Sequence, residues 1–153
     1  MSKSKKVKAD KKISQIEKNK ALACQLTQAQ NERDVRKLKQ LLSPNFICHI
    51  SDVPFPLNRE QYIQGVKMAH KAFSQLEFTV GDIVAEGNKV VVRITARGKH
   101  TGEYQGFAAS QQKVKFAGIA IRRISKGKIV EEWQTNDHLS LLQQIGLSVN
   151  HII

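Results

Sequence analysis

The sequence predicts an α+β fold in which N-terminal helices pack on one face of a strongly curved, mainly antiparallel sheet. Apolar residues recur at helical spacing up to about residue 74, and after residue 75 they alternate with polar ones. Two segments, 86–89 and 125–128, have the glycine-containing composition of hairpin turns. An order of helices first and then a run of long strands is typical of an α+β domain.

Three helices are expected in the first half of the chain. The first covers about residues 13–31, and the second covers residues 35–42. The second should end before Pro44, because the residue that precedes a proline is disfavoured in the α conformation. Asn58 is a good N-cap residue for the third helix, over residues 59–74.

Strands are expected in the second half, where apolar and polar residues alternate. After a first strand from about residue 76, the predicted strands cover residues 90–97 with a continuation to His100, then 114–124 and 129–137. A short closing helix follows, with apolar residues from Leu139 to Ile145.

The net charge of +12 is divided between a short N-terminal arm and the rest of the chain. Residues 1–20 hold eight lysines against Asp10 and Glu17, a net charge of +6. We expect the lysine-rich residues 1–12 to be disordered and residues 13–150 to form one domain. A basic arm can bind nucleic acid or an anionic surface, but this one lacks arginine and aromatic residues for stacking. We therefore favour a solvated tail that keeps the domain soluble.

The sequence excludes several classes of protein and site. No run approaches the ~18 apolar residues of a membrane span, and no apolar segment follows the basic start as a secretory signal requires. Cys24 and Cys48 are far apart and form no CxxC pair, so we expect a reducing, cytoplasmic location. The five histidines lack metal-ligand spacing, and no dinucleotide-binding, Walker A or HExxH motif occurs. We expect chemistry without a metal or cofactor, or no chemistry.

Polar residues on the last predicted strand are the first candidates for a functional site. Strict alternation places Trp133 and Asp137 on one face, together with Ile129, Glu131 and Thr135. A carboxylate in an apolar pocket has a raised pKa, because desolvation disfavours its charged form. Such a group can take a proton from a carbon next to a carbonyl and return it elsewhere.

Two histidines are further candidates. His100 continues the apolar face of residues 90–98, and His49 lies among apolar neighbours. With Asp137 they could converge on one pocket, where a histidine or tryptophan N–H would stabilise a developing oxyanion.

Each candidate also has a purely structural interpretation. Asp137 precedes the closing helix and is equally well explained as its N-cap. His49 and His100 are more often satisfied core or loop residues than catalysts, and Trp133 is most often a packing residue. The arginines of the strands are expected on a solvated or subunit-facing surface of the sheet: Arg93, Arg97, Arg122 and Arg123.

Several runs of residues resemble the SnoaL-like polyketide cyclases, also called ester cyclases. The resemblance covers about residues 17–146, and its C-terminal part is the most specific. The runs are Phe46-Ile47-Cys48-His49, Pro54 to Leu57, Arg59-Glu60-x-Tyr62, Leu76-x-Phe78-x-Val80, Glu86-Gly87-Asn88-x-Val90, Gly98-x-His100-Thr101-Gly102-Glu103, Gly127-Lys128-Ile129-Val130-Glu131-Glu132-Trp133-x-x-x-Asp137 and Leu141-Leu142-Gln143-Gln144-Ile145-Gly146.

The resemblance implies a cone-shaped α+β barrel of the nuclear-transport-factor-two-like superfamily, with an internal pocket and dimers formed through the sheet. Well-studied members close a ring by intramolecular aldol condensation, without metal or cofactor, and use an aspartate as general acid and base. That aspartate corresponds to Asp137, and His49 and His100 match positions expected to line the pocket. We expect aromatic residues to bind the substrate: Trp133, Tyr62, Phe116 and Phe46.

Four functional hypotheses follow. The first is a cofactor-independent cyclase or isomerase for a hydrophobic carbonyl compound, in which Asp137 carries the proton and His100 or His49 donates to the enolate oxygen. The second is a ligand-binding or dimerisation module of the same fold without chemistry. A third is hydrolysis or dehydration, which requires a second carboxylate or an arginine aimed into the pocket. The fourth is nucleic-acid binding through residues 1–20.

Overall fold

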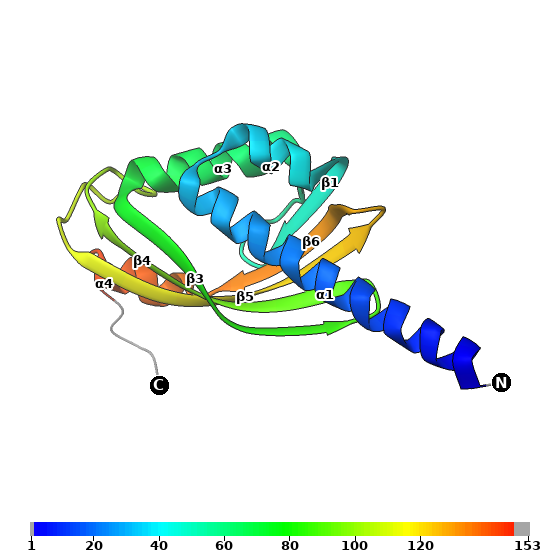
Figure 1. Ribbon diagram of the computed structural model, residues 1–153. Coiled ribbons are helices and arrows are strands. Elements are labelled where there is room, and N and C mark those ends of the chain that lie inside the picture. The colour runs from blue at the N-terminus through cyan, green and yellow to red at the C-terminus, as the bar shows by residue number, and fades with distance from the viewer. Residues whose placement is uncertain (1, 149–153) are drawn as a thin grey trace.

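The structure of the protein, a computed structural model, describes residues 2–148, with side chains from residue 14 onward. Figure 1 shows three helices over one face of a strongly bent sheet and a fourth, short helix after the last strand. This arrangement confirms the predicted α+β fold. The helices are α1 (Ser2–Glu32), α2 (Val35–Leu41), α3 (Arg59–Ala72) and α4 (His138–Gln144).

The sheet has six strands in the order β2-β1-β6-β5-β4-β3. All neighbouring strands are antiparallel except β1 and β6, which pair in parallel. The sheet is open, because its edge strands β2 and β3 are not hydrogen-bonded to each other. The strands are β1 (Leu42–Ile50), β2 (Leu57–Asn58), β3 (Phe73–Glu86), β4 (Lys89–His100), β5 (Lys113–Ser125) and β6 (Lys128–Asn136).

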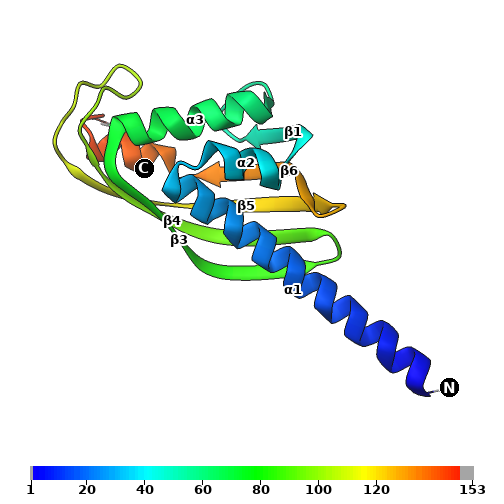
Figure 2. The same ribbon diagram turned by 45° about the horizontal axis from the view of Figure 1, so that its top comes forward.

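Helix α1 begins well before the expected start at residue 13. The backbone of residues 2–12 continues this helix, where the sequence predicted a disordered arm, and no glycine or proline interrupts it. Figures 1 and 2 both show the N-terminal part of α1 extending past the sheet. Its C-terminal part packs on the sheet through Ala23, Leu26 and Ala29, which are fully buried. The side chains of residues 1–13 lie outside the described part, so the role of the arm stays a prediction.

The expected boundaries of α2 and α3 depend on a proline and an N-cap. Helix α2 ends at Leu41, and Pro44 lies inside β1, where the pairing with β6 is interrupted between Leu42 and Ile47. Proline has no N–H to donate to a regular ladder, and it is tolerated here because the ladder with β6 is interrupted at this position. Asn58 caps α3 as predicted, since its side chain accepts from the backbone N–H of Gln61 at 2.9 Å. The Gln61 side chain accepts from the Asn58 backbone N–H at 2.8 Å, which completes a capping box.

Two apolar clusters hold the elements together. The larger lies between helices α1 to α3 and the sheet, and the smaller joins α4 to the end of α3 and to β3, β4 and β5. None of the described helices is both long and apolar enough to cross a membrane. The fully or nearly fully buried side chains of the larger cluster include Leu26, Leu38, Leu42, Phe46, Val90, Val92 and Ile129.

Candidate active site

A cavity of about 300 Å³ lies under α3, between the turn after β1, the β4–β5 connection and the start of α4. A narrower part of about 60 Å³ reaches Arg122 and Glu132 on the sheet. The two parts are continuous, because they share five lining residues: Gln30, Phe78, Phe116, Gln134 and Asn136. The cavity therefore has a wider mouth, an apolar middle and a polar floor.

Three polar side chains meet at the mouth of the cavity, which they all line. Nδ1 of His138 lies 2.6 Å from Oδ2 of Asp52, and Nε2 of His138 lies 3.2 Å from the hydroxyl oxygen of Tyr104. Asp52 comes from the turn after β1, Tyr104 from the β4–β5 connection and His138 from the first position of α4. These residues are far apart in the sequence, so the fold alone brings them together.

The connection that carries Tyr104 is held in place on both sides. The backbone N–H groups of Tyr104 and Phe107 each donate to the carbonyl of the other residue, at 3.0 and 2.9 Å. The Tyr104 ring packs edge-on against Phe73, with ring centroids 5.2 Å apart. These contacts fix the phenol of Tyr104 beside His138. The Tyr104 and His138 rings also pack edge-on against each other.

The contacts of His138 set the roles of its two ring nitrogens when the imidazole is neutral. Donation of Nδ1–H to the Asp52 carboxylate then leaves Nε2 as an acceptor for the Tyr104 hydroxyl. Burial raises the pKa of Tyr104, and the nearby charge of Asp52 raises it further. The phenol therefore remains protonated at neutral pH and can donate a hydrogen bond. A histidine oriented by a carboxylate, with a basic Nε2 facing a cavity, is suited to act as a general base.

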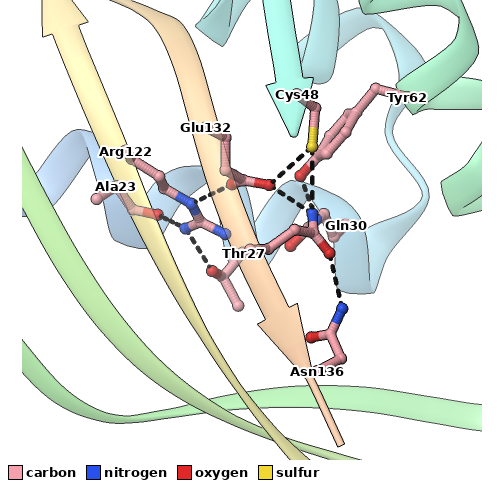
Figure 3. Close-up of polar contacts among 9 residues, drawn as sticks. Ala23, Thr27, Gln30, Cys48, Tyr62, Arg122, Glu132 and Asn136 are labelled. Carbon is pink, nitrogen blue, oxygen red and sulfur yellow. Dashed lines mark hydrogen bonds and ion pairs between the residues drawn. The ribbon is translucent and has the colours of Figure 1, made fainter. Parts of the chain in front are cut away.

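A buried ion pair forms the floor of the cavity (Figure 3). Arg122 of β5 and Glu132 of β6 are directly opposite in the antiparallel ladder, and Nε of the arginine donates to the carboxylate at 2.7 Å. Each side chain is only 1% exposed. Nη1 of Arg122 also donates to the backbone carbonyl of Ala23 and to the hydroxyl of Thr27, at 2.5 and 2.8 Å.

Further polar side chains surround Glu132 on the other side. The amide of Gln134 donates to its Oε1 at 2.6 Å, and the thiol of Cys48 donates to the same oxygen at 3.7 Å. Burial and the charge of Glu132 raise the pKa of the Cys48 thiol well above its ordinary value. The hydroxyl of Tyr62 accepts from the Gln30 amide at 2.6 Å, and its pKa is raised mainly by burial. Both groups therefore stay protonated, and the floor carries one positive and one negative charge.

Comparison with known proteins identifies the family. The family model described as SnoaL-like polyketide cyclase matches residues 20–145. The chain belongs to this family. Comparison with curated protein sequences finds no match.

Several solved structures are similar to this chain over most of its length. AclR from Streptomyces galilaeus, named as a candidate hydroxylase, is 27% identical, with a TM-score of 0.78; the match covers 86% of this chain and 97% of AclR. IdmH from Streptomyces antibioticus, named as a candidate polyketide cyclase, is 27% identical, with a TM-score of 0.76; the match covers 84% of this chain and 99% of IdmH. TsrD from Streptomyces laurentii is 28% identical, with a TM-score of 0.73; the match covers 82% of this chain and 92% of TsrD.

The last strand does not keep the alternation that the sequence predicts. Arg123 pairs with Glu131 but Ile124 pairs with Ile129, so β6 has one extra residue, Val130, at a β-bulge. The bulge reverses the faces beyond it, and Glu132 rather than Glu131 becomes buried. Ile129 therefore lies on the opposite face from Glu131, Trp133 and Thr135, and the part of the prediction that places Ile129 with them is wrong.

Asp137, the aspartate that the resemblance assigns to acid–base chemistry, caps α4. Its Oδ1 accepts from the backbone N–H of Ser140 at 3.1 Å, the side chain is exposed, and it does not line either part of the cavity. The adjacent His138 occupies the position at the mouth instead.

The two predicted histidines lie apart from the cavity and from each other. His49 is on the outer face of the sheet, where it stacks on Trp133 with ring centroids 5.6 Å apart and contacts Glu131 at 2.8 Å. His100 is fully buried, as the alternation along β4 predicts, but its Nδ1 binds Ser110 and its ring packs on Phe73. Neither histidine lines the two parts of the cavity.

The aromatic residues expected to bind substrate divide into two groups. Tyr62 and Phe116 line the cavity, and their role in substrate binding stays a prediction. Phe46 lies in the core behind Tyr62, with ring centroids 5.1 Å apart, and Trp133 lies on the outer face beneath Lys89. Of the four, two are in a position to contact a bound molecule.

Five functional candidates were missed by the sequence analysis: Asp52, Tyr104, Arg122, Glu132 and His138. Arg122 was expected on a solvated surface, yet the buried face of β5 runs through Val114, Ala120, Arg122 and Ile124. That alternation is visible in the sequence and could have placed the arginine inside. The three mouth residues lie in a turn, a loop and a helix start, where no periodic pattern exists to orient a side chain. Within the described part of the chain, no group of three metal-ligating side chains occurs.

Proposed function

We propose that the protein is an enzyme that moves a proton at a carbon next to a carbonyl group in a small hydrophobic molecule, and that this step leads to aldol cyclisation or isomerisation. The observation that supports the proposal best is the Asp52–His138–Tyr104 arrangement at the mouth of a largely apolar cavity. Family membership supports a small-molecule substrate. A purely ligand-binding role would not require a carboxylate-oriented histidine there.

The proposed reaction begins when Nε2 of His138 removes a proton from the carbon. The C–H bonding electrons then move into the carbonyl, whose oxygen becomes an enolate oxygen. The hydroxyl of Tyr104, released from Nε2 by the substrate, donates a hydrogen bond to that oxygen. Asp52 stabilises the imidazolium that forms. In cyclisation the enolate carbon then attacks a second carbonyl of the same molecule, and the imidazolium of His138 protonates the alkoxide oxygen that this attack forms. In isomerisation the imidazolium returns the proton to a different carbon of the conjugated enolate.

The proposal can be tested without the natural substrate. Proton removal next to a carbonyl exchanges that hydrogen for deuterium in D₂O, and NMR can follow this in a panel of aryl ketones, cyclic ketones and β-diketones. We expect the wild type to accelerate exchange in at least one class, and Asp52→Asn to lower that rate about 10²-fold, because the amide no longer fixes the tautomer of His138. Exchange at the background rate for every ketone, or equal rates in the two proteins, would contradict the proposal.

We further propose that the protein forms a homodimer through the outer face of the sheet. Ile119 is 51% exposed there, and it borders a shallow apolar surface with Ile121 and Trp133. Light scattering coupled to size-exclusion chromatography should give twice the monomer mass for the wild type and the monomer mass for Ile119→Lys. A monomeric wild type would overturn this proposal and leave the catalytic one untouched.

A further inference from the structure

Arg122 has a donor that the protein itself does not use. Its Nε and Nη1 groups donate to Glu132, Ala23 and Thr27, but Nη2 donates to no residue of the described part of the chain. Only one fully enclosed side-chain polar atom in that part lacks a partner, and it is Nε2 of His100. Nη2 of Arg122 therefore retains accessible surface, and the deep part of the cavity is the space that Arg122 lines.

Glu132 determines what this donor can bind. Its carboxylate lies 2.7 Å from the guanidinium, so the floor of the cavity has almost no net charge. A bound anion would be attracted by Arg122 but repelled by Glu132, and it would also lose its hydration. A neutral carbonyl oxygen accepts the Nη2 hydrogen bond without that repulsion. The deep part, at about 60 Å³, has room for a group as small as an acetyl or a ring carbonyl.

We propose that the floor of the cavity is a recognition site for a neutral carbonyl oxygen, which Nη2 of Arg122 holds. The side chains between floor and mouth are largely apolar, among them Phe78, Phe116 and Ile94. The matching molecule is therefore a dicarbonyl compound, with an apolar, flat middle, one carbonyl at Arg122 and the reacting carbonyl at Tyr104. The inference deepens the proposed function, because it adds a second oxygen and excludes an anionic group at the deep end.

Three naphthalene probes of similar shape test the preference in the wild type: 2-acetylnaphthalene, 2-isopropylnaphthalene and 2-naphthoate. Isothermal titration calorimetry should give a dissociation constant about tenfold lower for the ketone than for the hydrocarbon, since hydrogen bonds to charged groups are strong. The ketone should also bind more tightly than the carboxylate. Equal binding of ketone and hydrocarbon, or tightest binding of naphthoate, would overturn the proposal, and neither result depends on a variant that must fold.

Variants show at which end of the cavity the preference for the ketone over the hydrocarbon arises. Arg122→Met combined with Glu132→Gln should remove the preference for the ketone, because it removes the donor together with its counter-charge. His138→Gln should keep the preference while losing proton exchange, so failure at the floor can be distinguished from failure of the proposed reaction. If instead Tyr104→Phe abolishes the preference and the double variant keeps it, the ketone binds at the mouth and the assignment to Arg122 is wrong.

Discussion

Replacing Glu132 by glutamine should destabilise the protein by about 3–5 kcal/mol, the usual cost of removing one partner of a buried ion pair. Glutamine has nearly the same shape, so no cavity forms, but the guanidinium of Arg122 is left charged and buried without a counter-ion. Three elements depend on this arginine, because it ties β5 to β6 and to the backbone of α1. The free energy of unfolding from urea titration, followed by circular dichroism, measures the loss.

A matched control is available on the surface of the same sheet. Asp82 and Arg93 form an ion pair of similar geometry at 2.6 Å, but their side chains are 68% and 51% exposed. Asp82→Asn should therefore change the unfolding free energy by about 1 kcal/mol or less. The double variant Arg122→Met/Glu132→Gln should recover much of the loss, because no buried charge remains. A Glu132→Gln protein as stable as Asp82→Asn would show that water reaches the pair and that the floor is not dry.

His138→Gln should lower the rate of proton exchange by about 10²- to 10⁴-fold, which is the usual contribution of a general base. Glutamine removes the basic Nε2 but keeps a polar side chain at the start of α4. The neighbouring Asp137→Asn is the matched comparison, because asparagine is as good an N-cap as aspartate and should leave α4 intact. We expect Asp137→Asn to retain most of the exchange activity.

The opposite result is equally informative. If Asp137→Asn loses exchange at an unchanged melting temperature while His138→Gln retains it, the aspartate carries the proton, as the resemblance implies. The carboxylate would then have to leave the backbone N–H of Ser140 and turn into the cavity when substrate binds. Because Asp137 and His138 are adjacent at the start of α4, the two substitutions should have similar effects on the overall stability of the fold.

Much of the fold could be predicted because its elements follow regular periods. Asn58 caps α3 as a local rule predicts, and β4 keeps its alternation from Val90 to His100. The β-bulge at Val130 could not be predicted, since an extra residue in a strand changes the faces of all later residues without changing composition. This shift of the register by one residue places Trp133 on the outer surface of the sheet and not in the expected pocket.

The candidate site was predicted less well for a related reason. The sequence places a residue on a face of a helix or strand, but the groups at the mouth are in a turn, a loop and a helix start. Tyr104 reaches His138 only because its loop folds back through the Tyr104–Phe107 backbone pair. His138 and Asp137 are adjacent, and whether one or the other faces the cavity depends on which of them caps α4. Local propensity does not determine that choice, because it depends on tertiary contacts such as Asp52.

The most direct test of the account is a crystal structure with a flat aromatic compound bound that carries one carbonyl group at each end. We predict that the reactive carbon next to one carbonyl lies about 3–3.5 Å from Nε2 of His138, with the oxygen of that carbonyl within hydrogen-bond distance of the Tyr104 hydroxyl and the second carbonyl oxygen at Nη2 of Arg122. A ligand bound outside this cavity, or one whose reactive carbon faces the carboxylate of Asp137 instead of His138, would contradict the account.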